Sequence, residues 1–139
     1  MGWQSRVVEL LQAWARHAEQ FWYTMPGEPE MGCYGTGYNA WGVQTNQKYL
    51  AALAVLGTLG ADQGALSPAK VRRARERALA ALRFSLRSHL VGDYTCTDGT
   101  RWGHTWISGL GIERMMHAVD RMGDVLTDAD RDDLRRVMA

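Results

Sequence analysis

The 139-residue sequence predicts a single all-α domain, an incomplete (α/α) toroid made of helical hairpins. Two observations lead to this prediction. Helical hydrophobic periodicity occurs five times, and no segment shows a convincing strand pattern. The five segments also alternate between helices with one polar face and helices that are apolar nearly all round. This alternation is typical of outer and inner helices in a double layer.

The first two segments differ in their surroundings. The first helix is expected over about residues 5–23, with one polar face, and Pro26 and Pro29 end it. The second is expected over about residues 40–59. It is apolar on every side between residues 49 and 56, as expected of an inner helix enclosed by protein.

The remaining helices carry start signals. The third begins with Ser67 as cap and Pro68 in the first turn, and it directs many arginines outward. The fourth covers about residues 105–122. The fifth starts at Thr127, with Asp130 at the spacing of a capping box. This helix has no stop signal, and a closed ring of six hairpins needs more than twice this length. We therefore expect the N-terminal part of a larger toroid, with a free-standing five-helix bundle as the alternative.

Charge and hydropathy exclude some function classes. A net charge of +1 creates no field that would attract nucleic acid or an anionic membrane. The basic run over residues 70–77 has an acidic counterpart at 128–133, so it is interpreted as a solvated outer face. The longest apolar run, residues 50–56, is far shorter than the ~20 residues that cross a bilayer. With no signal peptide visible, we expect a cytoplasmic protein unless a leader has been removed.

The two cysteines, Cys33 and Cys96, do not form a disulfide framework. They are interpreted as two buried or free thiols, although a bridge or a zinc site shared with His104 stays open. Glu113 and His117 are four residues apart on a helix and fit an ion pair or hydrogen bond better than a metal site. We expect neither a metal nor another cofactor.

A weak repeat links the two inner helices. Asn39-Ala-Trp41 opens one and His104-Thr-Trp106 opens the other, 65 residues further on. In an array of hairpins this spacing returns the chain to the same mouth of the ring. Trp and Tyr offer flat faces for sugar rings, while Asn, Gln and His offer directed hydrogen bonds. The predicted substrate-binding residues are Tyr38, Trp41, Gln44, Asn46, Trp102 and Trp106.

Simpler structural roles are available for the same residues. Asn39 is a good helix cap, His104 fits a bond to a backbone carbonyl, and tryptophans often lie in cores. Against these roles, two helix N-termini at one mouth favour an anionic group there, such as the carboxylate of a uronic acid.

The stretches YNAWGVQTNQKYLAALAVLG and RWGHTWISGLGIERMMHAV resemble the inner toroid helices of heparinase II/III-like polysaccharide lyases, over about residues 30–122. The resemblance implies β-eliminative cleavage of an acidic, uronic acid-containing oligosaccharide or polysaccharide. It implies that Asn39 and His104 bind the carboxylate or move the proton. The tyrosine of that family normally lies beyond Ala139, which leaves Tyr38 and Tyr94 as local substitutes, with Tyr94 as the predicted catalytic residue. The rest of the toroid, or a homo-oligomer, would cover exposed helix faces.

Two other functions compete. A glycoside hydrolase on the same toroid needs two opposed carboxyl groups, and Asp93, Asp98 and Glu113 are the local choices. A non-catalytic carbohydrate-binding or interaction scaffold would use the same aromatic residues without a base. The residues alone do not decide between these functions and the lyase.

Overall fold

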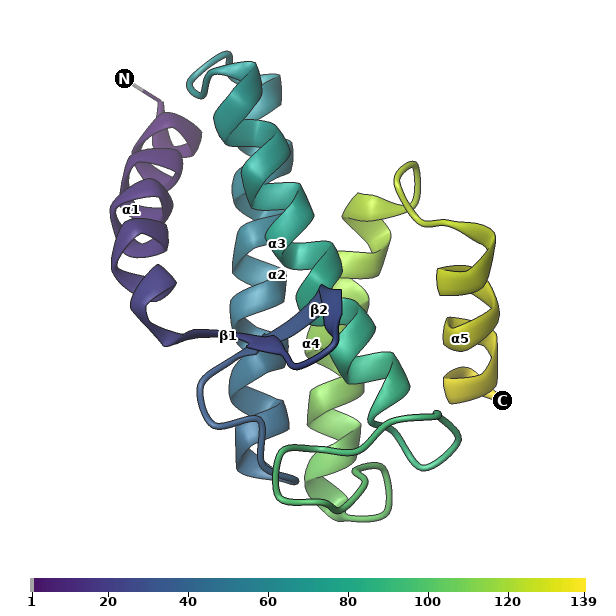
Figure 1. Cartoon of the computed structure of the whole chain (residues 1–139). Helices are drawn as coiled ribbons and strands as arrows, with labels where there is room; N and C mark the ends of the chain where they lie inside the picture. Colours follow the sequence, from purple (N-terminus) through teal and green to yellow (C-terminus); the bar gives the residue numbers. More distant parts are fainter. Residues whose placement is uncertain (1) are drawn as a thin grey trace.

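The computed structural model describes residues 2–139. Within these residues the chain forms five α-helices and one small two-stranded sheet (Figure 1). In chain order the elements are α1 (Trp3–Ala18), the 3₁₀ turn η1 (Glu19–Phe21), β1 (Trp22–Met25), β2 (Glu28–Tyr34), α2 (Trp41–Asp62), α3 (Pro68–Arg87), α4 (Trp106–Met122) and α5 (Asp128–Met138). The fold is therefore mainly helical, as predicted, with the hairpin as an addition.

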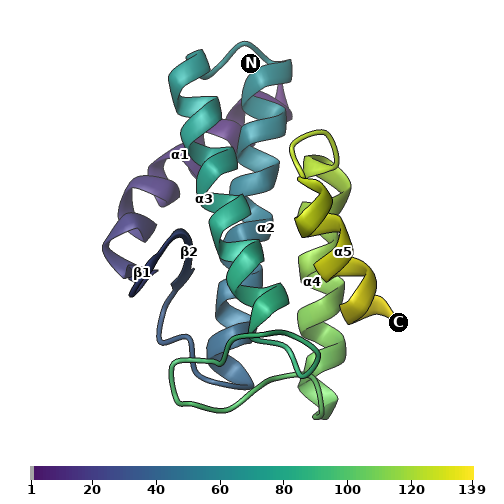
Figure 2. The same ribbon diagram turned by 45° about the vertical axis from the view of Figure 1, so that its right-hand side comes forward.

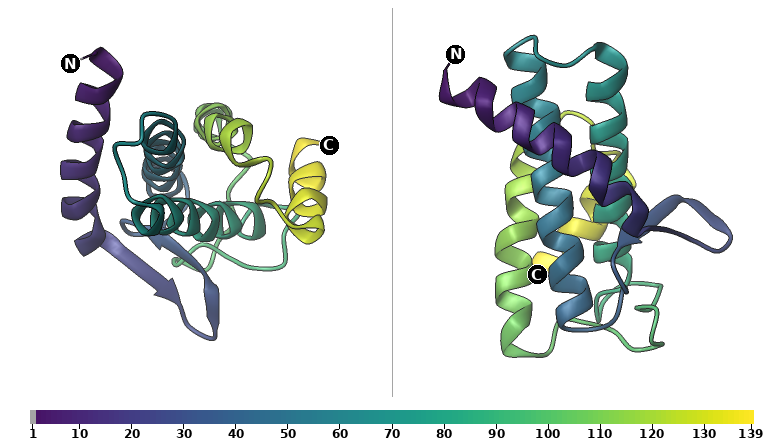
Figure 3. Two further views of the ribbon diagram at one scale, coloured as in Figure 1. Left: turned by 90° about the horizontal axis from the view of Figure 1, so that it is seen from above. Right: turned by 90° about the vertical axis from the view of Figure 1, so that its left-hand side faces the viewer.

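Four of the helices form two rows. Seen from above, α2 and α4 lie in one row and α3 and α5 in the other, while α1 stands to the side of α2 (Figure 3). Figure 2 shows α5 beside α4, on the opposite side of the molecule from α1. Helices α2 and α4 run in the same direction and begin at the same end of the molecule, and α3 runs opposite to them (Figure 1). The loops that precede α2 and α4 are therefore neighbours.

Helix α2 is the centre of the core. It packs against α1, α3 and α4, and its leucines Leu50, Leu53 and Leu56 are almost completely buried. Each buried leucine contributes roughly 1.5–3 kcal/mol to stability by removing apolar surface from water. The facing side of α3 is rich in alanine, which lets the two helices approach closely; its buried residues include Ala74, Ala78, Ala81 and Leu82. The second helix lies where it was predicted, but Tyr49, Ala51, Ala52 and Val55 are only half-buried, so within residues 2–139 it is not enclosed on every side.

The predicted start signals are present. The Ser67 hydroxyl accepts a hydrogen bond from the Lys70 N–H at 3.3 Å, and Pro68 is the first residue of α3. At α5, the Thr127 hydroxyl accepts from the Asp130 N–H at 3.2 Å, and the Asp130 carboxylate accepts from the Thr127 N–H at 3.0 Å. These reciprocal bonds are the capping box expected from the sequence.

The first helix is shorter than expected and is followed by a hairpin. Helix α1 ends at Ala18, and residues 22–25, which the helical prediction partly included, form β1. This strand pairs antiparallel with β2, with Trp22 opposite Tyr34, and the turn uses Gly27 at a φ of 75°. Aromatic and β-branched residues favour this extended pairing, and the pairing with the next strand across the Pro26-Gly27 turn overrides the helical pattern. The prediction that the chain contains no strand was therefore wrong.

The hairpin also changes the place of α1. Because residues 22–34 lie between α1 and α2, the two helices do not form a tight hairpin, and α1 crosses α2 obliquely (Figure 3). The end of α1 is held by Glu19, which pairs with Arg73 and Arg77 of α3. The Arg77 guanidinium lies 4.4 Å from the centre of the Trp22 ring. The expected outer position of the first helix, in one row with the third and fifth, is not observed.

The arginines of α3 bind carboxylates of other elements. Arg83 pairs with Asp130 of α5 at 2.8 Å, and Arg87 pairs with Asp93 of the following loop at 2.8 Å and with Glu28 of β2 at 3.2 Å. Within the basic run itself, Arg73 and Arg77 pair with Glu19 and Arg75 pairs with Asp124, so the run is not simply a solvated face. No helix in residues 2–139 has the length and apolar character needed to cross a membrane.

Candidate functional site

The end of the molecule at which α2 and α4 begin is called the rim below. It consists of residues 35–41 and 96–106 (Figure 1). The two loops are joined by hydrogen bonds: the Thr97 N–H donates to the Gly37 carbonyl at 2.9 Å, and the Asn39 N–H donates to the Asp98 carboxylate at 3.2 Å. The rim is thus a connected surface built from distant parts of the sequence.

Asn39 occupies the junction of the two loops. Its amide nitrogen donates to the Arg101 carbonyl at 3.1 Å, and its amide oxygen accepts from the Ala40 N–H at 2.7 Å. The Asn39 side chain does not cap α2, because the residue at the cap position is Ala40, which has no side-chain hydrogen bond to the helix. One amide N–H of Asn39 is left for another acceptor.

Ala40 has an unusual backbone conformation, with φ 63° and ψ −101°. A non-glycine residue at positive φ stores strain of the order of 1–3 kcal/mol, and such residues concentrate at functional sites. The strained residue lies between Asn39 and Trp41, so it fixes how both side chains leave the backbone.

Two exposed tryptophans stand beside each other on the rim. Trp41 is the first residue of α2 and Trp106 the first residue of α4, and their rings meet edge to face with centroids 6.2 Å apart. Trp41 is 63% exposed and Trp106 is 76% exposed. Tyr38 is also exposed in the adjacent loop. Large aromatic rings gathered in water are typical of a binding surface.

His104 and Tyr94, two of the three predicted catalytic residues, have different surroundings. His104 lies exposed in the loop two residues before Trp106. Tyr94 is half-buried and packs against the cluster of Met25, Met31, Cys33 and Phe84. The guanidinium of Arg87 lies 5.7 Å from its ring centre. Tyr94 therefore has a packing role beneath the hairpin.

Asn46 and Trp102, two of the predicted substrate-binding residues, lie in the core. Asn46 is fully buried; it accepts from the Tyr34 N–H and donates to the Ala81 carbonyl and the Ser85 hydroxyl. Trp102 is 2% exposed, and its indole N–H donates to the Ser85 carbonyl at 2.8 Å. Neither side chain reaches the solvent, so the prediction of substrate contact is corrected for both. Their polar groups satisfy buried backbone atoms instead.

Gln44, three residues after Trp41 in α2, is also buried. Its amide oxygen has no protein donor among residues 2–139. The side chain borders a cavity of about 10 Å³ that is also lined by Trp102, Ile107 and Ser108. A cavity of this size has room for about one water molecule and not for a sugar. Direct substrate contact by Gln44, as predicted, is therefore also corrected.

Sequence reasoning missed His89. This residue follows α3, is 8% exposed, and packs its ring edge to face against Trp102 with centroids 4.7 Å apart. Burial lowers the pKa of His89. A side chain at Gly103 would come within 2.4 Å of the His89 ring. His89 and Gly103 thus fix the start of the loop that carries His104, but no periodicity or motif in the sequence marks this role.

The carboxyl groups considered for hydrolysis have structural partners. The Arg87 hydrogen bond lowers the pKa of Asp93. Burial raises the pKa of Asp98, but hydrogen bonds from Thr100 and Asn39 outweigh it and leave the pKa below its usual value. A general acid in a glycosidase needs a raised pKa. Neither aspartate has one, and Glu113 lies exposed on α4.

The cysteines are two free, buried thiols. Burial, together with the neighbouring Cys96, raises the pKa of Cys33 to about 12. No group of three or more His, Cys, Asp or Glu side chains in residues 2–139 is arranged to hold a metal ion. Such a group is therefore formed neither by Cys33, Cys96 and His104, the zinc alternative, nor around the pair of Glu113 and His117.

No family model, curated protein or solved structure matches the chain.

Proposed function

We propose that the chain is part of a carbohydrate-active protein that binds a uronic acid-containing glycan at the rim and cleaves it by β-elimination in the complete toroid. The exposed pair of Trp41 and Trp106 carries this proposal. Burial of the two indole rings would be favourable, yet both rings are exposed to water. Exposed apolar surface of this kind is typical of a binding site. The flat C–H faces of sugar rings fit such apolar surfaces, and the indole N–H groups can bind hydroxyls.

An anionic sugar suits the start of α2 in particular. The N-terminus of α4 is closed by a capping box, in which the Thr105 N–H donates to the Ser108 hydroxyl at 3.3 Å. The N-terminus of α2 has no side-chain cap. The Val43 N–H already donates to the Tyr38 carbonyl at 2.9 Å, so the Trp41 and Gly42 N–H groups and the positive dipole end favour a carboxylate. Arg101, exposed in the facing loop, adds a positive charge.

The reaction would depend on Asn39 and His104. β-Elimination removes the proton next to a carboxylate, and this proton becomes acidic once donors stabilise the developing negative charge. Asn39 has one amide N–H available for that purpose, beside the start of α2. His104 is an exposed imidazole two residues from Trp106, and histidine is the side chain that most often acts as a general base, so it is the proposed base. Tyr94 is less suited, because it packs beneath the hairpin.

The arrangement of helices supports the toroid as the wider architecture. Helices α2 and α4 form one row and α3 and α5 the other, and both helices of the first row start at the rim (Figure 3). In a toroid the first row would be the inner ring, and its N-terminal ends would surround one mouth. The remainder of the ring, or a second copy, would then complete the site.

The test compares two proteins, the 139-residue chain and the longest natural form of the protein that can be produced. Each is mixed with a panel of uronic acid-containing and neutral glycans. Binding is followed by tryptophan fluorescence, and cleavage by the ultraviolet absorbance of the conjugated C4=C5 product. Acidic glycans should bind, and Trp41→Ala and Trp106→Ala should each weaken binding about tenfold or more, since one stacking contact is worth about 1–3 kcal/mol in comparable aromatic sites. Trp3→Ala is the matched control, because Trp3 is 70% exposed on α1, outside the rim.

Catalysis is tested with His104→Ala and Asn39→Ala. Both variants should stay folded by circular dichroism and lose the ultraviolet signal, while binding persists in His104→Ala. New reducing ends without the absorbance would show hydrolysis instead and overturn the lyase. Binding without either product would identify a non-catalytic carbohydrate-binding scaffold. Equal binding by the wild type and both tryptophan variants would contradict the proposal that the glycan binds at the rim.

A further inference from the structure

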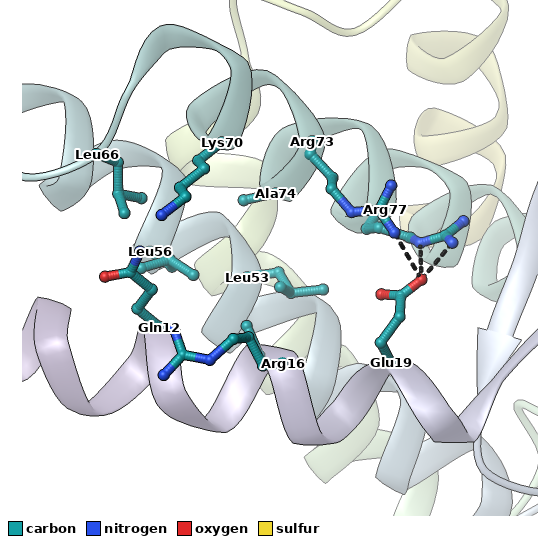
Figure 4. Close-up of a pocket in the computed structure, with 11 residues that line it drawn as sticks. Gln12, Arg16, Glu19, Leu53, Leu56, Leu66, Lys70, Arg73, Ala74 and Arg77 are labelled. Carbon is teal, nitrogen blue, oxygen red and sulfur yellow. Dashed lines mark hydrogen bonds and ion pairs between the residues drawn. The ribbon is translucent and has the colours of Figure 1, made fainter.

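A second concave site lies between α1 and the pair α2 and α3, away from the rim. Its volume is about 360 Å³, within the range of small-molecule pockets. Helix α1 forms one wall and α3 the opposite wall (Figure 4). The end of α1 is fixed to α3 through Glu19, which binds Arg73 and Arg77, so the two walls are held at a defined separation.

The floor of this cavity is apolar. Leu53 and Leu56 of α2, Leu66 of the following loop and Ala74 of α3 line it (Figure 4). Among residues 2–139, no aromatic side chain borders the cavity. A nucleobase or a sugar ring would therefore find no stacking surface here, whereas an aliphatic chain would be removed from water between the two helices, above leucines that are themselves 3–7% exposed.

The edge of the cavity is cationic. Lys70 extends from α3 toward α1, Arg16 runs along α1 toward Gln12, and the Gln12 amide reaches into the space between the two helices (Figure 4). The lining contains one carboxylate, Glu19, and its ion pairs are with Arg73 and Arg77. Within residues 2–139, neither Arg16 nor Lys70 forms an ion pair. Two cations beside an apolar floor are thus available for an external anion.

We propose that this cavity binds a small amphipathic anion, a carboxylate with an aliphatic chain. The carboxylate lies between Arg16 and Lys70, and the chain covers Leu53, Leu56 and Leu66. The site differs from the rim in both location and chemistry. Charge selects the head group, because two unpaired cations attract a carboxylate and repel an ammonium group. The leucine floor selects the chain, because burial of each CH₂ group favours binding.

The experiment uses the 139-residue chain with 1-anilinonaphthalene-8-sulfonate as fluorescent probe and three competitors of equal chain length: decanoate, decanol and decyltrimethylammonium. Decanoate should displace the probe at a concentration at least about tenfold lower than decanol, since charged hydrogen bonds add to the apolar contact. Decyltrimethylammonium should displace it least. Calorimetry with decanoate measures the affinity directly. If decanol competes as well as decanoate, or if neither binds, the proposal is wrong.

Lys70→Glu is the decisive variant. It should weaken decanoate binding about tenfold or more, because it replaces a cation at the head-group position with an anion. It should also fold well, since Glu three residues after Ser67 completes a capping box at the start of α3. Lys48→Glu makes the same charge change at an exposed position of α2 that does not line the cavity, and it should leave the affinity within about twofold. Equal effects of the two variants would overturn the proposal.

A second variant tests the cavity independently of charge. Ala15 of α1 borders it, and Ala15→Leu would fill part of the volume without disturbing the helix. Decanoate binding should fall about tenfold while thermal stability is kept or raised. Unchanged binding in this folded variant would show that the ligand lies elsewhere.

Discussion

The amide oxygen of Asn46 in α2 accepts a hydrogen bond from the backbone N–H of Tyr34 at 2.9 Å and so connects the end of the hairpin to the central helix. The same side chain donates to the Ala81 carbonyl at 3.1 Å and the Ser85 hydroxyl at 3.0 Å on α3. One fully buried amide therefore joins three elements, α2, α3 and β2. The hairpin and the helices should unfold together because of this connection.

Replacing Asn46 should be strongly destabilising. Asn46→Ala removes all three hydrogen bonds and leaves buried polar groups without partners, so we expect the free energy of unfolding to fall by roughly 2–4 kcal/mol. Chemical denaturation measures the loss. Thr45→Ala is the control; its hydroxyl donates to the Trp41 carbonyl within α2, and its loss should cost less than about 1 kcal/mol. Equal costs for the two variants would contradict the structural role of Asn46.

Ala40→Gly should stabilise the protein. Ala40 has φ 63°, a conformation that glycine adopts without the Cβ penalty. Relief of the strain should outweigh the added flexibility of the unfolded chain and raise the free energy of unfolding by about 1 kcal/mol. Ala51→Gly, within α2, should lower it by about 1 kcal/mol. A loss of stability in Ala40→Gly similar to that in Ala51→Gly would show that residue 40 is not strained.

The pair of Arg83 and Asp130 should make stability depend on pH. Burial raises the pKa of Asp130, but hydrogen bonds from Arg83 and Thr127 outweigh it and leave the pKa below its usual value. The folded state thus binds this proton more weakly than the unfolded state. The stabilisation is complete above the unfolded pKa of Asp130 and is lost as pH falls through the lower folded pKa.

Asp130→Asn should therefore lower the free energy of unfolding by roughly 2 kcal/mol at pH 7 and by clearly less near pH 2. Urea denaturation of wild type and variant over this pH range measures the difference. Asp132→Asn, at an exposed position of α5 that pairs with Arg135, should have an effect of less than about 1 kcal/mol at either pH. A cost of Asp130→Asn that does not change with pH would contradict the assigned pKa.

The two cysteines should resist modification in the folded protein. The pKa of Cys33 is raised to about 12 from the ordinary value of 9.0, which lowers its thiolate fraction near pH 8 by about a thousandfold. Burial raises the pKa of Cys96 as well, and hydrogen bonds oppose that rise in part. Reaction with 5,5′-dithiobis(2-nitrobenzoic acid) should be at least about a thousandfold slower in buffer than in denaturant. Rapid reaction of one thiol in buffer would show that its loop opens.

Part of the rim could be predicted from the sequence. Trp41 and Trp106 were expected at one mouth because each opens a buried helix, and the structure brings their rings together. The residues around them were harder to assign. Asn46 and Trp102 carry the same polar and aromatic groups as the exposed residues, but they point into the core. Residue type indicates what a side chain can bind, and packing decides whether a ligand can reach it.

By itself, the sequence determined the local features: the presence of the second helix, the caps at Ser67 and Thr127, and the start of α4. These features depend on contacts within a few residues, and hydrophobic period and capping chemistry express them directly. The tertiary structure alone decided the hairpin of residues 22–34, the position of His89, and the cavity beneath α1. The position of His89 and the cavity depend on groups far apart in the chain, and the hairpin, although local, packs against α3 and α2. The free energy of burying and pairing such groups exceeds the local preferences.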